Sequence, residues 1–236
     1  MARLPSLLQP PIAFAHRGAS AHAPGNTLEA FRLGLRLGAT GLESDVWLTA
    51  DGIPVLDHDG RVRQRMRQRP IKSMDRRDLP AHIPALDDLY AECGSDFQLS
   101  LDLKDESAAR ATLAVARAAG AAERLWLCHP DREVLVGLRR DAGDAHLVHS
   151  TRLRRMPHGP ERLAAQLAND GIEVVNLHRT DWTGGLTTLF HRFSRLTFGW
   201  DAQHERMLLE LLDIGIDGVY SDHVDRMMDA VRARAG

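Results

Sequence analysis

The stretch from residue 12 to residue 52, IAFAHRGASAHAPGNTLEAFRLGLRLGATGLESDVWLTADG, contains the pattern that decides the fold. A short apolar run at 12–16 is followed by helical periodicity over 27–37 and by a second apolar run at 41–48. Turn-forming residues separate the three segments, which fits a strand, a helix and a strand. This order predicts a βαβ unit and therefore a parallel sheet.

The same alternation continues to the end of the chain. Strands are expected at 12–16, 41–48, 97–103, 124–128, 146–150, 172–177, 195–199 and 218–221. Helices are expected at 27–37, 86–92, 106–119, 132–140, 160–169, 183–193, 203–213 and 224–233. Such a pattern predicts an α/β fold, a (β/α)₈ TIM barrel, which typically takes about 250 residues. A doubly wound open sheet is the alternative, but no Gly-rich dinucleotide fingerprint follows the first strand.

The chain is expected to form one barrel domain over residues 1–236, with residues 1–10 as a flexible N-terminus. One irregular stretch, 60–84, interrupts the alternation and predicts a short insertion after the second strand. It carries arginines at every second position from 61 to 69. These arginines form either a solvated face or a surface that attracts anionic substrates or membranes.

Composition excludes several classes of protein. The net charge of −2 gives no basic field for nucleic acid. No apolar run approaches the roughly 20 residues of a membrane span, so no stable membrane insertion is expected. Cys93 and Cys128 are too few for a disulfide framework, and the N-terminal stretch does not have the pattern of a signal peptide. Both features predict a cytoplasmic protein with reduced thiols. No feature predicts an oligomeric state.

Acidic side chains gather where the active site of such a barrel is built, at the carboxyl ends of the strands. Glu43 and Asp45 are two residues apart in one expected strand, so they share a face. Asp102 and Lys104 share a face of the next strand in the same way. Three carboxylates at one spot repel one another, and a hard divalent cation, Mg²⁺ or Ca²⁺, would resolve this. The alternative is that arginines and lysines of the rim pair with these acids.

Two histidines belong to the same place. His16 ends the first expected strand, and His58 follows the second between two aspartates. Imidazoles can act as general acid and general base near neutral pH. Arg17 and Lys104 add positive charge that suits an anion such as phosphate. Structural roles are expected for the histidines at 22, 82, 146, 158, 191 and 204.

Several of these motifs occur together in a known family. The segments HRG (16–18), PGNTLEAF (24–31), GLESDVWLT (41–49), DG (51–52) and HD (58–59) stand in that order, followed by LDLK (101–104), Trp200 and GIDGVYSD (215–222). From about residue 12 to residue 222 the chain resembles the glycerophosphodiester phosphodiesterases. The ordered N-terminal set is the specific part of this resemblance.

The resemblance implies a metal-dependent enzyme that hydrolyses a small-molecule glycerophosphodiester to glycerol 3-phosphate and an alcohol. It implies that His16 and His58 are the acid–base pair, and that Arg17, Lys104 and Trp200 bind substrate. It assigns the divalent cation, Mg²⁺ or Ca²⁺, to Glu43, Asp45 and Asp102. Alternative functions are a lysophospholipase D-like or sphingomyelinase D-like phosphodiesterase and a phosphate-binding barrel without turnover.

This sequence departs from the family pattern at a few positions. Gly25 and Asp102 stand where glutamate is usual, and Asp102 is shorter by one methylene. The segment between His58 and Asp102 is also short for the family. A small insertion of this kind predicts a comparatively open mouth to the active site.

Overall fold

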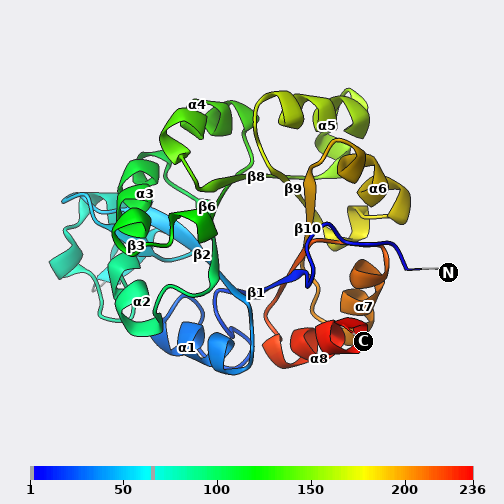
Figure 1. The fold of residues 1–236 in the computed structure, drawn as a ribbon. Helices are drawn as coiled ribbons and strands as arrows, with labels where there is room; N and C mark the ends of the chain where they lie inside the picture. Colours follow the sequence, from blue (N-terminus) through cyan, green and yellow to red (C-terminus); the bar gives the residue numbers. More distant parts are fainter. Residues whose placement is uncertain (1–2, 65–66, 236) are drawn as a thin grey trace.

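The computed structural model describes residues 3–64 and 67–235, and its central feature is a closed barrel of eight parallel strands ringed by helices (Figure 1). Closure comes from the pairing of β1 with both β2 and β11, so the first and last strands are neighbours. The expected (β/α)₈ barrel is confirmed. Its strands are β1 (Ile12–His16), β2 (Gly41–Leu48), β6 (Gln98–Leu103), β7 (Leu125–His129), β8 (His146–Thr151), β9 (Val174–His178), β10 (Leu196–Trp200) and β11 (Gly218–Ser221).

Each expected helix is present outside the barrel, with small shifts at the ends. The helices are α1 (Leu28–Arg36), α2 (Leu86–Cys93), α3 (Ala109–Ala118), α4 (Arg132–Ala142), α5 (Gly159–Asn169), α6 (Gly184–Arg192), α7 (Glu205–Asp213) and α8 (Val224–Ala235). The largest shift is at α3, because a 3₁₀ turn, η3 (Glu106–Ala108), precedes it. Asp105 caps this turn by accepting a hydrogen bond from the Ser107 N–H at 3.0 Å.

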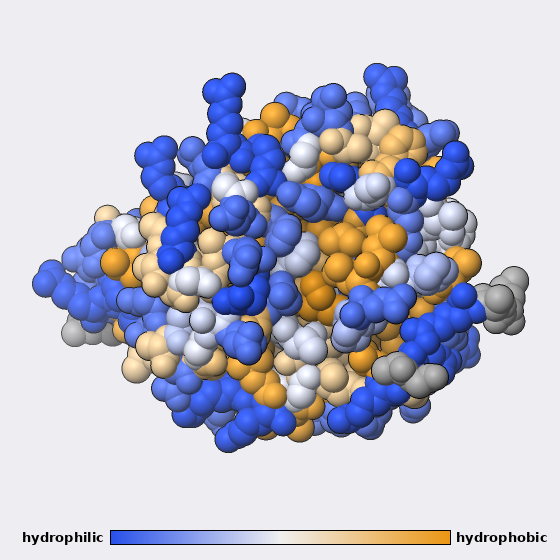
Figure 2. All heavy atoms as spheres, viewed as in Figure 1, coloured by the Kyte–Doolittle hydropathy of each residue, from blue (hydrophilic) through white to orange (hydrophobic). Residues whose placement is uncertain are grey.

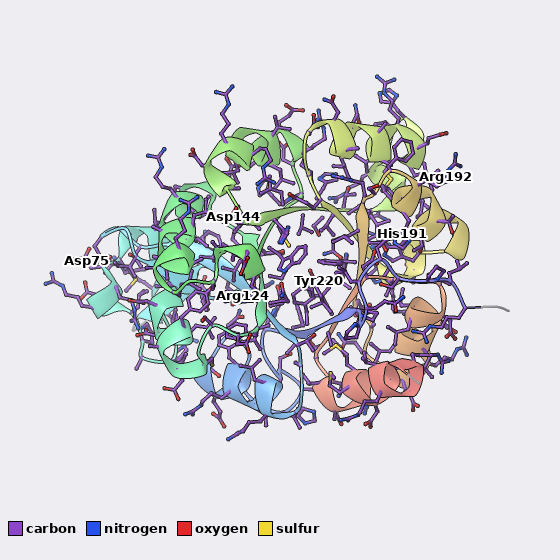
Figure 3. The ribbon with its side chains drawn as sticks, in the orientation of Figure 1. Asp75, Arg124, Asp144, His191, Arg192 and Tyr220 are labelled. Atoms are coloured by element: carbon purple, nitrogen blue, oxygen red, sulfur yellow. The ribbon has the colours of Figure 1, made fainter. Side chains whose placement is uncertain are left out.

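Aromatic rings fill the interior of the barrel. Phe14 stacks on Tyr220 with ring centroids 4.7 Å apart, and Phe198 packs against Phe14 at 5.5 Å. Tyr220 lies near the middle of the ring of strands (Figure 3). Glycines make room for these rings, since a Cβ at Gly41 would lie 2.6 Å from Phe14 and one at Gly218 would lie 2.7 Å from Phe198. Because these rings fill the interior of the barrel, a site is expected at the carboxyl ends of the strands.

The insertion after β2 has more regular structure than the expected loop. β3 (Pro54–Leu56) runs antiparallel to β2, and β4 (Arg61–Gln64) pairs with β5 (Arg67–Pro70) in a hairpin. Two 3₁₀ turns follow, η1 (Ile71–Ser73) and η2 (Arg76–Asp78). Its buried side chains form a small core of their own, which includes Val55, Val62, Ile71, Met74, Leu79, Ile83 and Ala85. The arginines at 61, 63, 67 and 69 lie on the hairpin, and Arg65 falls outside the described residues.

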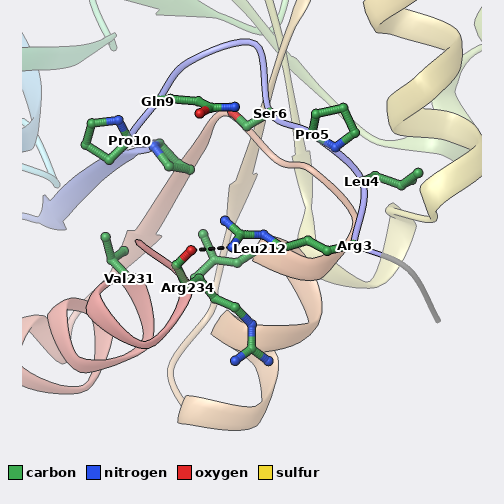
Figure 4. A pocket seen from close by; sticks show the side chains of 10 residues that line it. Arg3, Leu4, Pro5, Ser6, Gln9, Pro10, Leu212, Val231 and Arg234 are labelled. Atoms are coloured by element: carbon green, nitrogen blue, oxygen red, sulfur yellow. Dashed lines mark hydrogen bonds between the residues drawn. The ribbon is translucent and has the colours of Figure 1, made fainter. Parts of the chain in front are cut away.

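The segment before β1, which was expected to be flexible, makes hydrogen bonds with the rest of the barrel. The Leu4 N–H donates to the Asp213 carbonyl, and the Ser6 hydroxyl and the Leu7 N–H donate to one oxygen of the Asp217 carboxylate at 2.8 and 2.6 Å. These contacts hold residues 3–10 against the amino ends of the strands; residues 1–2 lie outside the described residues. A cavity of about 540 Å³ lies between this segment and the side chains of Leu212, Val231 and Arg234, and Arg3 donates to the Arg234 carbonyl beside it (Figure 4).

The surface at this end of the molecule combines an apolar centre with a hydrophilic border (Figure 2). No helix within residues 3–64 and 67–235 has both the length and the apolar character needed to cross a membrane.

Candidate active site

A cavity of about 500 Å³ opens at the carboxyl ends of the strands. All eight residues that the sequence singles out line this one cavity: His16, Arg17, Glu43, Asp45, His58, Asp102, Lys104 and Trp200. Six others complete the lining: Ser150, Asn176, Asp201, Gln203, Tyr220 and Asp222. The lining thus draws on strands and loops from almost the whole length of the chain.

The three carboxylates meet because of strand register. Asp45 in β2 lies directly opposite Asp102 in β6, and Glu43 lies opposite His16 in β1. One oxygen from each of Glu43, Asp45 and Asp102 lies within 4.8 Å of the others. Glu43 and Asp45 are buried, at 5% and 2% exposure. Three oxygen donors at this spacing fit a hard divalent cation such as Mg²⁺ or Ca²⁺.

Positive side chains also approach this cluster. The Lys104 ammonium lies 3.0 Å from Asp45 and 3.2 Å from Asp102, and Arg17 Nε lies 3.8 Å from Asp45. The ion pairs that were the alternative to a cation are therefore present, and His16 Nε2 adds a third positive group 3.7 Å from Glu43. Burial raises the pKa of Glu43 to about 7, with the Asp45 and Asp102 charges adding to the rise and His16 opposing it. Burial and the neighbouring carboxylates thus oppose the charged form of Glu43, which a bound cation would favour.

The turn after β1 explains the HRG motif. Arg17 has a φ of +54°, a left-handed conformation in which its N–H donates to Glu43 Oε2 at 2.9 Å. Gly18 follows with a φ of +75°, and a Cβ there would lie 2.5 Å from the Ala30 backbone of α1. The Arg17 Nε is buried without a hydrogen-bond partner, although Arg17 lines the cavity. An unsatisfied buried donor beside a cavity is suited to an anion.

Each of the two histidines has a carboxylate at Nδ1. The His16 Nδ1 lies 2.5 Å from Asp222 Oδ1, and the His58 Nδ1 lies 2.7 Å from Asp59 Oδ1. The Ser20 hydroxyl supports the first pair by donating to the same Asp222 oxygen at 2.9 Å. A carboxylate at Nδ1 keeps the proton there and leaves Nε2 as the nitrogen that exchanges protons.

The charge on His16 depends on its neighbours. Burial lowers the pKa of His16, but the Glu43 charge and the hydrogen bond to Asp222 outweigh this effect and raise the pKa to about 9. Asp222, which directly follows β11, was not among the predicted site residues. Its position could have been inferred from the sequence, because in a closed barrel the end of the eighth strand lies beside the end of the first strand, where His16 stands.

The opposite wall combines aromatic and polar groups. Trp200 packs edge-on against His178, with ring centroids 4.5 Å apart, and the Arg152 guanidinium lies 5.7 Å from the Trp200 ring. Asp201 adopts a φ of +67° and contacts His178 Nε2 at 2.9 Å. The carbonyl oxygen of the Asn176 side chain is buried without a partner. This wall therefore offers an acceptor and a carboxylate for hydroxyl groups of a ligand.

The side chains of His149 and His129 do not line the cavity. His149 follows Val148, which faces the barrel interior, so the side chain of His149 points to the outer helix layer. His129 borders a neighbouring hollow that shares Lys104 with the cavity.

Comparison with known proteins gives the same family along most of the chain. Residues 16–226 match the model of the glycerophosphoryl diester phosphodiesterase family. A Mycobacterium tuberculosis protein named "Probable glycerophosphodiester phosphodiesterase 2" is 28% identical over 94% of this chain and 91% of its own length.

Solved structures show the same fold. A phosphodiesterase from Oleispira antarctica, in complex with the product sn-glycerol-3-phosphate, superposes with a TM-score of 0.80 at 20% identity, over 94% of this chain and 97% of that one. A glycerophosphodiester phosphodiesterase from Thermotoga maritima superposes with a TM-score of 0.79 at 21% identity, over 92% and 97%. The match over residues 16–226 shows that the chain belongs to the glycerophosphoryl diester phosphodiesterase family.

Proposed function

We propose that this phosphodiesterase hydrolyses glycerophosphodiesters to glycerol 3-phosphate and an alcohol, with a divalent cation as cofactor and two histidines as proton carriers. The observation that carries the proposal is the cluster of Glu43, Asp45 and Asp102, in a cavity that His16 and His58 also line. Family membership and the product complex of the Oleispira protein support the substrate class.

Glu43, Asp45 and Asp102 are the proposed ligands of Mg²⁺ or Ca²⁺. The cation would stabilise negative charge on a phosphoryl oxygen. Arg17, whose buried Nε has no hydrogen-bond partner, and Lys104 are placed beside these ligands and would contact the other phosphate oxygens. Together these groups hold the phosphodiester at the mouth of the barrel.

His16 and His58 move the protons. Asp222 and Asp59 fix the Nδ1 side of each ring, so both histidines present Nε2 for proton exchange. One Nε2 accepts the proton of the attacking hydroxyl, and the other gives a proton to the leaving alcohol. A fixed tautomer matters because a ring with its proton on Nε2 cannot accept another there.

The lining favours a small diester. Asn176, Asp201 and Gln203 are polar, and only Trp200 and Tyr220 among the lining residues present large apolar rings. Trp200 would pack against the carbon face of the glycerol, while the polar groups bind its hydroxyls. A lysolipid chain would need a longer apolar channel beside Trp200.

The test is hydrolysis of glycerophosphocholine with product analysis. Glycerol 3-phosphate is expected to form, EDTA to abolish turnover, and added Mg²⁺ or Ca²⁺ to restore it. His16→Ala and His58→Ala should each lower kcat by roughly 10²–10⁴-fold while the melting temperature changes little. Wild-type turnover in both variants would refute the acid–base assignment, and turnover in EDTA would refute the cation requirement.

A further inference from the structure

A second cluster of metal-ligand side chains lies outside the cavity. One ligand atom from each of His22, His223 and Asp225 lies within 4.8 Å of the others. Across residues 3–64 and 67–235, this cluster and the acidic one are the two groups of three such side chains that come this close. We propose that His22, His223 and Asp225 form a second metal site, selective for an ion such as Zn²⁺ or Co²⁺.

The closure of the barrel builds this cluster. His22 lies in the turn after β1, whereas His223 and Asp225 lie at the start of α8, after β11. Because β1 pairs with β11, these two loops are neighbours despite their separation in sequence. A backbone hydrogen bond of 3.2 Å from Ala21 to Asp222 holds them together. The three side chains are therefore placed by the fold and not by a single flexible loop.

The distances suit a small ion. His22 Nε2 lies 3.1 Å from Asp225 Oδ1, and ligands about 2.0–2.2 Å from a tetrahedral ion lie about 3.3–3.5 Å apart. The rings of His22 and His223 are nearly perpendicular, with centroids 6.1 Å apart. His223 completes the set with a ring nitrogen that lies within 4.8 Å of the other two ligand atoms. His22 and Asp225 are exposed, so water can reach the fourth position.

The donor chemistry separates the two sites. Imidazole nitrogen suits Zn²⁺ and Co²⁺, whereas Mg²⁺ and Ca²⁺ prefer shells of oxygen alone. The cluster of His22, His223 and Asp225 should therefore bind Zn²⁺ in the presence of the Mg²⁺ that occupies the acidic cluster. A simple ion pair accounts for His22 and Asp225, but it does not account for a second imidazole at the same point.

A bound ion would cross-link the turn after β1 to α8. That turn carries Ser20, which donates to Asp222, the partner of His16. Binding to the folded protein alone also raises stability in proportion to the logarithm of ion concentration over Kd. The expected effect of Zn²⁺ is a melting temperature that rises with the logarithm of the free Zn²⁺ concentration once the site is filled.

The test is titration of the full chain with Co²⁺ in millimolar Mg²⁺, followed by visible absorption and by displacement with Zn²⁺. We expect one equivalent bound with a tetrahedral spectrum. His22→Ala and His223→Ala should each weaken binding at least about tenfold. The control variant is His82→Ala, which removes an exposed histidine elsewhere and should bind like the wild type.

A further variant distinguishes the two clusters. Asp45→Asn should leave Co²⁺ binding in Mg²⁺ unchanged, even though it disables the acidic cluster. Loss of Co²⁺ binding in Asp45→Asn, or wild-type affinity in both His22→Ala and His223→Ala, would overturn the proposal. Absence of any Co²⁺ binding by the wild type would do the same. None of these outcomes depends on hydrolysis, so the proposal can fail while the proposed function stands.

Discussion

Asp222 contacts the ring of His16 and does not belong to the cluster of Glu43, Asp45 and Asp102. Its carboxylate lies 2.5 Å from the Nδ1 of His16 and is held by Ser20. Asp222→Asn removes the negative charge and permits the wrong tautomer of His16, so kcat should fall about 10–100-fold with little change in KM. Steady-state kinetics on glycerophosphocholine would measure this effect.

Two comparisons make that result interpretable. Asp59 is 79% exposed in its side chain, so water can replace it and Asp59→Asn should cost less than Asp222→Asn. Asp229→Asn, which removes an exposed partner of Arg232, should leave kcat unchanged. An equal loss in all three variants would argue against an orienting role for Asp222.

Lys104 would compete with a cation bound at the acidic cluster for the same oxygens. Its ammonium lies 3.0 Å from Asp45 and 3.2 Å from Asp102. Lys104→Met should therefore tighten Mg²⁺ or Ca²⁺ binding, because no resident charge has to be displaced, while KM rises because a phosphate contact is lost. Calorimetry and kinetics would measure the two effects separately. Lys72→Met removes an exposed lysine as a control, and weaker cation binding in Lys104→Met would contradict the argument.

The residues of the cavity were predictable to the extent that strand parity and motifs determine them. Glu43 and Asp45 are two residues apart in β2, and Asp102 stands between two leucines in β6, so their orientation towards the barrel interior follows from the pleat. Asp222 and Asp201 follow no such rule, because their contacts depend on which strands become neighbours when the sheet closes. His22 gave no sequence signal at all, since its partners lie at 223 and 225.

Among the elements, the N-terminal segment depends on one buried carboxylate. One oxygen of Asp217 accepts from Ser6 and Leu7, and the other accepts from Thr197 and His191 at 2.7–2.9 Å. Asp217→Asn places an amide N–H against one of these donor sets and should lower the free energy of unfolding by about 3 kcal/mol. Denaturant unfolding would measure the loss, and hydrogen exchange should rise in residues 3–10.

The stability that Asp217 contributes should decrease in acid. Burial acts to raise the pKa of Asp217, but the hydrogen bonds from His191 and its other donors dominate and lower the pKa below 3.8. The contribution of Asp217 is therefore complete above the unfolded value of 3.8 and is lost as the pH falls through the lower folded value. An identical pH profile for Asp217→Asn in acid would contradict the assignment.

The β-strands also depend on glycines that give space to rings. Gly218→Ala would place a Cβ 2.7 Å from Phe198 in the barrel interior and should destabilise the protein by about 1–3 kcal/mol. Gly137 of α4 has open space around it, so Gly137→Ala should instead stabilise by about 0.5–1 kcal/mol. Opposite signs in thermal unfolding are expected, and a neutral Gly218→Ala would show that the ring can move.

Elements with local signals were predictable, and those with distant partners were not. Apolar runs and helical periods predicted the barrel strands and helices because each pattern is local. The hairpin of β4 and β5 was missed, since alternating arginines look like a solvated loop. The N-terminal segment was missed because its anchors, Asp213 and Asp217, lie more than 200 residues away in sequence.

At the scale of the whole molecule, the pKa of His149 makes the free energy of unfolding depend on pH. Its side chain is 7% exposed between β8 and the outer helices. Burial, together with the nearby Arg132 charge, lowers the pKa of His149 to about 4. The ring therefore stays neutral in the folded barrel above about pH 4, whereas in the unfolded chain it takes up a proton below about pH 6.5. Protonation of His149 between these two values is therefore linked to unfolding.

This linkage predicts how acid destabilises the barrel. Between the unfolded pKa of 6.5 and the folded value of about 4, the unfolded chain binds the extra proton. The free energy of unfolding should therefore fall by up to about 1.4 kcal/mol per pH unit on acidification across that window, from this group alone. His149→Gln keeps a polar side chain but cannot titrate, so its stability should change less steeply between pH 6.5 and 4. Urea unfolding of both proteins at several pH values would measure the two slopes, and parallel slopes would mean that His149 is protonated without unfolding.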